Sequence, residues 1–157
     1  MALLDPAYED AEVGRTVELL GGRRTLRRPV GTRLQAHDML QQGLPGHALE
    51  RLVSNVAILR GHQGLEKAIG ISLRTYQRRK DALDKPLSPE QSGRAWKFAE
   101  ILARATELLG SQAEAEAWLE SPAIALNGRR PIDLLSTPAG VETLERHLGR
   151  LEYGVYT

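Results

Sequence analysis

One long segment, residues 89–109, constrains the fold of this chain more than any other. Ser88 suits a helix N-cap, Pro89 the first helical position, and Gly110 a helix end. Polar residues recur within the segment every three or four positions and form one narrow stripe: Arg94, Lys97, Glu100, Arg104 and Glu107. The other residues in this part are mostly apolar, so more than one surface must cover the helix. We therefore predict that this helix is central and contributes to a dimer interface.

The composition favours helices over strands. Hydrophobic residues make up 41% of the 157 residues and aromatic residues only 4%, so aliphatic side chains must fill the core. No convincing strand occurs, which favours an all-α fold. The absence of cysteine excludes disulfides, thiolate metal sites and cysteine nucleophiles. No apolar run reaches the length of about 18 residues that a membrane span needs, and the N-terminus lacks the features of a signal peptide. We expect a cytoplasmic protein.

The charge is distributed unevenly along the chain. Residues 60–86 hold seven basic and three acidic residues, a balance of +4. Residues 87–157 hold seven basic and ten acidic residues, a balance of −3. A basic block followed by an acidic block suggests two different binding functions in one chain.

The segment LEKAIGISLRTYQRRK, residues 65–80, has the pattern of a helix-turn-helix. Gly70 permits the positive φ that a sharp turn between helices needs. Ile71 can fill the hydrophobic gap inside the turn, and Ser72 is a good N-cap for the next helix.

The second helix of this unit is predicted to run from Leu73 to about Leu83, with Leu73 and Tyr76 packed inward. Its outward side chains suit DNA, because arginine pairs with guanine, glutamine with adenine, and other cations with phosphates. The predicted DNA-contacting residues are Ser72, Arg74, Thr75, Gln77, Arg78, Arg79 and Lys80. The alternative is a charged helix that is exposed to solvent and does not bind DNA.

Salt dependence separates the two interpretations. If a dimer makes about six phosphate contacts on a pseudo-palindromic site, the logarithm of the binding constant should fall with the logarithm of the salt concentration with a slope of about −5.

Three parts are predicted along the chain. Residues 1–31 carry breakers and charges, and we expect a flexible N-terminal arm, either an ordinary ragged terminus or a basic arm on the DNA backbone. Residues 32–110 are predicted to form a helix-turn-helix domain for DNA binding and dimerisation. Residues 111–157 are predicted to form a small helical domain, with Thr137 as the N-cap of its last helix.

Motifs typical of enzymes are missing from the sequence. No phosphate-binding glycine motif or serine nucleophile motif occurs, and no carboxylate pair stands out as acid and base. The histidines lack metal-ligand spacing, and all four are expected at the surface: His37, His47, His62 and His147. We expect a protein that is not an enzyme and that has no metal or cofactor of its own.

Three motifs, in this order, resemble the antitoxins of the Xre/MbcA/ParS type, which are partners of RES-domain toxins. They are GISLRTYQRR at 70–79, LSPEQSGRAWKFAEILARATELLG at 87–110, and AEAWLESPAIALNGRRPIDLLSTPAGVETLERHLGRLEYGVY at 115–156. The resemblance covers residues 33–157. It implies an all-α protein with an Xre-like helix-turn-helix core and a C-terminal toxin-binding domain. It also implies that the protein represses its own operon and neutralises an NAD-consuming toxin by covering the toxin's active site.

The resemblance also implies which residues contact the toxin. The matching positions are Asn127, Gly128, Arg129, Arg130, Pro131, Leu134, Leu135, Gly140 and Leu151 to Thr157. The leucines are expected to build the domain. The predicted toxin-contacting residues are Arg129, Arg130, Glu152, Tyr153, Gly154, Val155, Tyr156 and Thr157. A terminal carboxylate and a tyrosine could occupy a polar NAD pocket through charge-assisted hydrogen bonds.

One alternative function remains open from the sequence. The chain could be a stand-alone helix-turn-helix transcription regulator whose C-terminal domain dimerises or senses a ligand. A neighbouring gene that encodes a RES-domain toxin would separate this alternative from an antitoxin.

Overall fold

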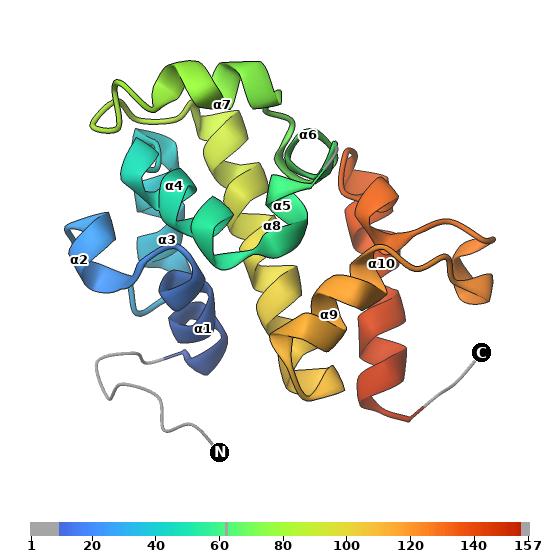
Figure 1. Ribbon diagram of the computed structural model, residues 1–157. Helices are drawn as coiled ribbons and strands as arrows, with labels where there is room; N and C mark the ends of the chain where they lie inside the picture. The colour runs from blue at the N-terminus through green and yellow to red at the C-terminus, as the bar shows by residue number, and fades with distance from the viewer. Residues whose placement is uncertain (1–9, 62, 155–157) are drawn as a thin grey trace.

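A computed structural model describes residues 10–61 and 63–154 of the chain. Within these residues every regular element is a helix, which confirms the predicted all-α fold (Figure 1). None of the helices in these two ranges is both long and apolar enough to cross a membrane. The elements are α1 (Ala11–Leu19), α2 (Gly22–Leu26), α3 (Arg33–Gln42), α4 (Gly46–Asn55), α5 (Ala57–Arg60), α6 (Gly64–Ile69), α7 (Leu73–Arg79), α8 (Pro89–Leu109), α9 (Gln112–Leu119), the 3₁₀-helices η1 (Ile124–Leu126) and η2 (Pro131–Leu134), and α10 (Pro138–Glu152).

Helix α8 runs through the middle of the molecule, as the sequence predicts (Figure 1). It packs against α1, α3 and α6 and also against α9 and α10. Seven of its residues are at most 1% exposed: Ser92, Ala95, Phe98, Ala99, Ile101, Leu102 and Ala105. The helix therefore joins the N-terminal and C-terminal parts of the chain through one core. Its predicted part in a dimer interface stays a prediction.

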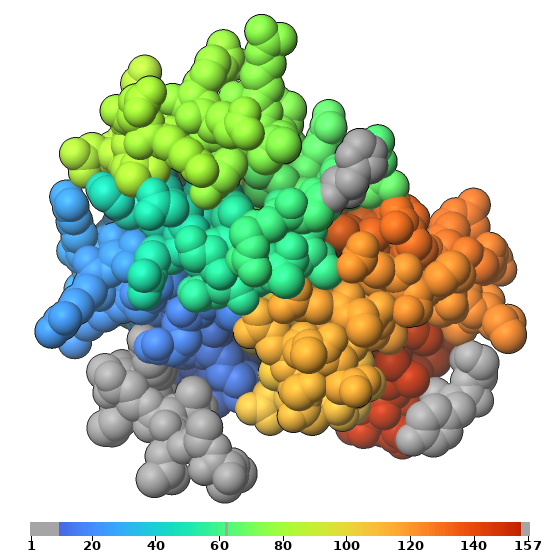
Figure 2. All heavy atoms as spheres, viewed as in Figure 1, coloured from blue at the N-terminus to red at the C-terminus, as the bar shows by residue number. Residues whose placement is uncertain are grey.

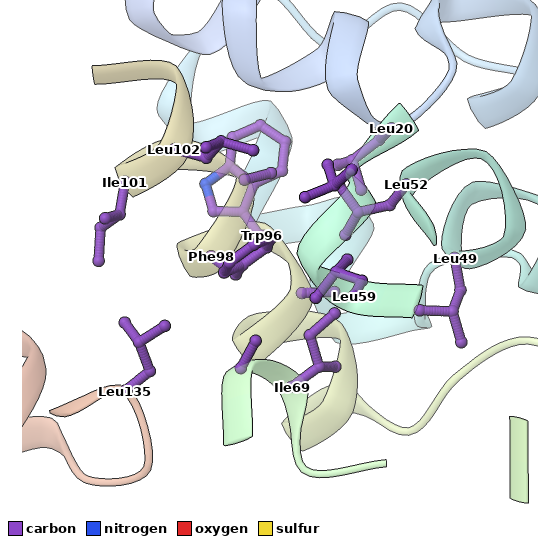
Figure 3. Packing of buried hydrophobic residues seen from close by; sticks show 14 of the residues in the cluster. Leu20, Leu49, Leu52, Leu59, Ile69, Trp96, Phe98, Ile101, Leu102 and Leu135 are labelled. Carbon is purple, nitrogen blue, oxygen red and sulfur yellow. The ribbon is translucent and has the colours of Figure 1, made fainter. Parts of the chain in front are cut away.

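The core around α8 is aliphatic, with a few aromatic side chains. Figure 3 shows Trp96 and Phe98 on the side of α8 that faces Leu52 of α4 and Leu59 of α5. Leu20, which follows α1, belongs to the same cluster. Truncating one such buried leucine to alanine typically costs about 2–5 kcal/mol, so these contacts fix the position of each helix.

Side-chain caps start the helices where the sequence predicts them. Ser88 Oγ accepts a hydrogen bond from Gln91 N at 3.1 Å at the start of α8. Thr137 Oγ1 accepts one from Gly140 N at 3.0 Å at the start of α10. Each cap stabilises its helix by about 1 kcal/mol, because it satisfies an amide that has no partner within the helix.

The flexible arm predicted for residues 1–31 is wrong for residues 10–31, which are folded onto the body. The Asp10 carboxylate caps α1 by accepting hydrogen bonds from two backbone amides. Val13, Val17 and Leu20 are at most 1% exposed, and α1 packs against α8. Their spacing of four and three residues places them on one helical face, a pattern that the intervening charges concealed. Residues 1–9 lie outside the described residues.

Four residues of the polar stripe of α8, namely Lys97, Glu100, Arg104 and Glu107, line a charged cleft of about 560 Å³ that α1, α3 and α10 also border. Glu100 is only 5% exposed. It accepts hydrogen bonds from Lys97 Nζ at 2.7 Å and from Arg33 Nη1 at 3.2 Å. Lys97 also reaches Glu145 of α10 at 3.2 Å. Burial lowers the pKa of the Lys97 ammonium, but its bonds to the two glutamates outweigh burial and raise it. These ion pairs tie α3 and α10 to α8.

Candidate nucleic-acid and protein interfaces

The turn between α6 and α7 has the geometry that the sequence predicts. Gly70 has φ of 79°, in the left-handed region that favours glycine, and an added Cβ there would collide with the Arg94 guanidinium. Ile71 is 1% exposed and fills the turn. Ser72 Oγ accepts a hydrogen bond from Thr75 N at 3.1 Å and so caps α7. The helix-turn-helix prediction is supported at each of these positions.

Helix α7 lies at one edge of the molecule, at the top of Figure 1, and presents most of its predicted DNA-contacting side chains to solvent (Figures 1 and 2). It ends at Arg79 instead of near Leu83. Tyr76 is 7% exposed and anchors the helix to the body. Ser72, Thr75 and Arg79 are partly buried. The exposed members of the set are Arg74, Gln77, Arg78 and Lys80.

The cations of α7 are held only by weak contacts. Within the described residues, none of its arginines, nor Lys80, forms an ion pair with a carboxylate. Lys80 Nζ lies 5.3 Å from the centre of the Tyr76 ring. In the following loop, Asp84 is shared by Arg27 at 3.6 Å and His47 at 3.2 Å. Positive charge on α7 is therefore left available for phosphates.

The prediction that Leu73 packs inward is wrong. Its exposed fraction is 57%, whereas Tyr76, one turn later, is buried. Ile71 in the turn and Tyr76 supply the buried side chains of this region. As the first residue of α7, Leu73 instead extends the exposed surface formed by Arg74 and Gln77.

A second exposed surface is the η1 segment of the C-terminal part. Asn127 and Gly128 both have positive φ, 56° and 77°, and close a tight loop. Ala123 N donates to Arg129 O at 3.1 Å, and Gly128 N donates to Ala123 O at 2.9 Å, which fixes the loop. The Arg129 side chain is exposed. Arg130 is half-buried and donates two hydrogen bonds of 3.0 Å to the Asp133 carboxylate, so Arg129 is the freer of the two predicted toxin contacts.

The most exposed large hydrophobic side chain described on this loop is Ile124, at 95%. The sequence predictions did not select it. The local sequence carried no signal for it, because Leu126 of the same loop is also apolar but is buried, at 5% exposure. An isoleucine held outward on a fixed loop can anchor a protein partner.

The last turn of α10 carries the remaining predicted toxin contacts. Tyr153 is 85% exposed, and Gly154 is exposed as well. Glu152 accepts two hydrogen bonds from the Arg104 guanidinium, the longer at 3.2 Å. Hydrogen bonding to Arg104 lowers the pKa of this carboxyl group. Glu152 therefore holds α10 on α8 before it meets any partner. Val155, Tyr156 and Thr157 lie outside the described residues.

The prediction that all four histidines lie at the surface is wrong for His147, which is buried at 8% exposure. Its ring stacks on Trp118 of α9, with ring centres 6.2 Å apart and planes 9° from parallel. Burial, and secondarily the charge of Arg150, lowers the pKa of the imidazole. The described residues contain no group of three or more His, Asp or Glu side chains that could hold a metal ion.

Two family models match the chain one after the other. The Antitoxin Xre-like helix-turn-helix domain matches residues 35–100, which include the α6–α7 unit. The Antitoxin Xre/MbcA/ParS C-terminal toxin-binding domain matches residues 104–154, which include η1 and α10. The chain belongs to the Xre/MbcA/ParS-type antitoxin family. The resemblance stated from the sequence is thereby confirmed, and so is the order of a helix-turn-helix domain followed by a C-terminal domain.

Individual members of this family are similar to parts of the chain. A protein named Antitoxin Xre from Yersinia enterocolitica is 34% identical over 92 residues, which cover 58% of this chain and 62% of the relative. Antitoxin Xre from Pseudomonas putida is 32% identical over 84 residues, 54% of this chain and 52% of the relative. The Prs ADP-ribosylating antitoxin from a Sphingobium species is 24% identical over 127 residues, 75% of this chain and 78% of the relative. The chain thus spans between about half and three fifths of the two Xre relatives.

Proposed function

We propose that the chain is the antitoxin of a type II toxin–antitoxin system, that it neutralises an NAD-consuming RES-domain toxin, and that it represses its own operon. The observation that carries the proposal is the arrangement of two family domains in tandem, each with an exposed surface suited to its own partner. Helix α7 and the η1–α10 surface lie in different parts of the molecule (Figure 1). One chain can therefore bind DNA and toxin at the same time.

Operator binding is proposed for α7. Its exposed Arg74 and Gln77 have the chemistry to read base edges, and Arg78, Arg79 and Lys80 extend the positive surface toward phosphates. A single α7 reaches few base pairs, so we propose that a homodimer binds a pseudo-palindromic operator. Binding to chromosomal DNA places the protein in the cytoplasm.

Toxin binding is proposed for the C-terminal part. Arg129, Tyr153 and Gly154 are exposed beyond a rigid loop and helix, which keeps the entropy lost on docking small. We propose that Val155, Tyr156 and Thr157 contact the toxin's active site, where the Tyr156 hydroxyl can form hydrogen bonds with groups that bind NAD. The name of the Sphingobium relative links an antitoxin of this similarity to ADP-ribosylation, a reaction that consumes NAD.

The experiment that tests the proposal is co-expression of the chain with the adjacent open reading frame, followed by a mass measurement of the purified complex. We expect a stable complex with a RES-domain protein whose toxicity the chain suppresses. Recovery of the chain alone as a homodimer that binds DNA would favour the stand-alone regulator. In either case the chain acts by binding and not as an enzyme.

A further inference from the structure

We propose that Leu73 reads sequence in the bound DNA by contacting the C5-methyl group of a thymine in the major groove. The inference rests on the proposed function, because it requires that α7 enters the groove of operator DNA. It adds an apolar, base-specific contact to a surface for which only arginine, glutamine and hydroxyl contacts were predicted.

The position of Leu73 on α7 carries the proposal. In helix-turn-helix proteins the N-terminal residues of the second helix reach the base edges, and Leu73 is the first residue of α7. Its neighbour Ser72 is already engaged, since its hydroxyl oxygen accepts from Thr75 N at 3.1 Å and lies 3.0 Å from Thr75 Oγ1. The cap thus uses the Ser72 hydroxyl as both acceptor and donor. Leu73 and Arg74 are the exposed side chains at this end of the helix, and Leu73 is the apolar one.

The neighbours of Leu73 define the face on which it lies. Gln77 is four residues further along α7, so both side chains lie on the same side of the helix. Arg74 is adjacent, and both polar residues are exposed. An isolated exposed leucine is ordinary on a protein surface, but this one, 57% exposed, stands among groups that suit base edges and phosphates. Duplex DNA is the binding partner that offers both an apolar group for Leu73 and polar or charged groups for Arg74 and Gln77.

The chemistry of the major groove supplies a specific partner. Thymine is the one of the four bases that presents a methyl group there, and cytosine presents only a C5–H at the same place. Leucine can form no hydrogen bond, so its largest contribution to recognition comes where it meets this methyl group. Burying one methyl-sized group gives about 0.8 kcal/mol, which corresponds to roughly a four-fold change in Kd.

The test compares thymine with deoxyuridine, which lacks only the methyl group. The bound sequence is first selected from a pool of random duplexes, and each thymine is then replaced in turn. For the wild-type chain, we expect one thymine per half-site whose replacement weakens binding about four-fold. In Leu73→Ala the same replacement should change Kd by less than about two-fold, because the double-mutant cycle isolates the contact.

Leu34→Ala provides a matched control, since Leu34 is a 72% exposed leucine on α3. This variant should keep the full thymine preference even if its overall affinity changes. Circular dichroism and the melting temperature establish that both variants are folded. A thymine preference that persists in Leu73→Ala, or the absence of any such preference in the wild type, overturns the inference and leaves the proposed function intact. Failure of the wild type to select any duplex overturns both.

Discussion

Single side chains on the two interfaces differ in how firmly the fold holds them. Glu152 and Arg130 are fixed by ion pairs within the chain, whereas Arg74, Arg78 and Tyr153 extend into solvent. A side chain that is already fixed by an ion pair loses little conformational entropy on binding, but it has to give up its existing partner. An exposed side chain gains a partner on binding but loses conformational entropy when it becomes ordered. We therefore expect the largest losses of affinity from exposed side chains on rigid segments.

Ile124 is the clearest example of such a side chain. Replacing Ile124 with Asp should weaken toxin binding by about ten-fold or more, because it places a charge where an apolar anchor would be desolvated. Stability should change by no more than about 0.5 kcal/mol, as expected for a surface position. Calorimetric titration of the toxin measures the first effect and urea unfolding the second. Leu34→Asp, at another exposed apolar position, is the control and should bind toxin normally.

His147 predicts how stability depends on pH. Its pKa is lowered in the folded state by burial and by Arg150, whereas the unfolded chain titrates near 6.5. Above pH 6.5 the imidazole is neutral in both states and has no effect on stability. As the pH falls below 6.5, the unfolded chain binds the proton first, so the free energy of unfolding decreases until the pH reaches the folded pKa. Urea unfolding between pH 7.5 and 5 measures this decrease.

A His147→Phe variant provides the comparison for that measurement. Phenylalanine keeps an aromatic ring against Trp118 but carries no titrating group. The variant should lose less stability than the wild type over the same pH range, while carboxylates contribute equally to both proteins. Parallel curves for the two proteins would refute the assignment to His147.

At the scale of elements, short helices depend on their neighbours for their position. Helices α2, α5 and α6 have only five, four and six residues, too few to be stable alone in water. Helix α2 packs against α1 and α4, α5 packs against α4 and α6, and α6 packs against α8, and this packing supplies the missing stability. Truncating one buried side chain that docks such a helix should therefore lower the free energy of unfolding strongly.

The docking of α1 gives a direct prediction. Leu20→Ala should reduce the free energy of unfolding by about 2–5 kcal/mol, because Leu20 is fully buried in the shared core. Chemical denaturation measures the change. A change below about 0.5 kcal/mol, the size expected of Leu34→Ala, would mean that residues 10–31 contribute as little as a loose arm.

Helix α7 can be tested through its charges. Arg78→Ala should reduce the slope of log Kd against log salt for operator DNA by about 1 for each copy bound, because one phosphate contact is lost. Fluorescence anisotropy at several salt concentrations gives the slope. Arg146 of α10, which pairs with Glu142, is the control position, and Arg146→Ala should leave the slope unchanged. Equal slopes for wild type and Arg78→Ala would remove Arg78 from the interface.

In the whole molecule, the charged cleft beside α8 connects the DNA-binding part to the toxin-binding part. Arg33 of α3 and Glu145 of α10 both reach the same polar stripe, through Glu100 and Lys97 respectively. The side chains proposed for DNA binding and those proposed for toxin binding are nevertheless separate sets. One function should therefore be removable without loss of the other.

Deleting residues 153–157 tests this separation. The deletion should leave the melting temperature and the operator affinity unchanged, because α10 ends at Glu152 and its Arg104 pair is retained. Neutralisation of the toxin should weaken. Growth of cells that express toxin with full-length or truncated protein is the measurement, and equal protection by both would exclude an active-site role for the tail.

The sequence by itself determined the helical class, the starts of α7, α8 and α10, and the turn before α7. Caps such as Ser72 and Ser88 act on amides three residues away, and Gly70 acts within its own turn. These features depend on local sequence, so local patterns predict them. The family resemblance added the order of the two domains.

Only the tertiary structure decided which side chains are buried and which are free. Glu100, read as part of an outward stripe, is buried because Arg33, 67 residues away in sequence, pairs with it. Contacts between distant segments likewise decide that Leu73 and Ile124 are exposed and that α1 packs on the core. Burial is set by contacts between segments far apart in the chain, and local periodicity carries no information about which segments meet.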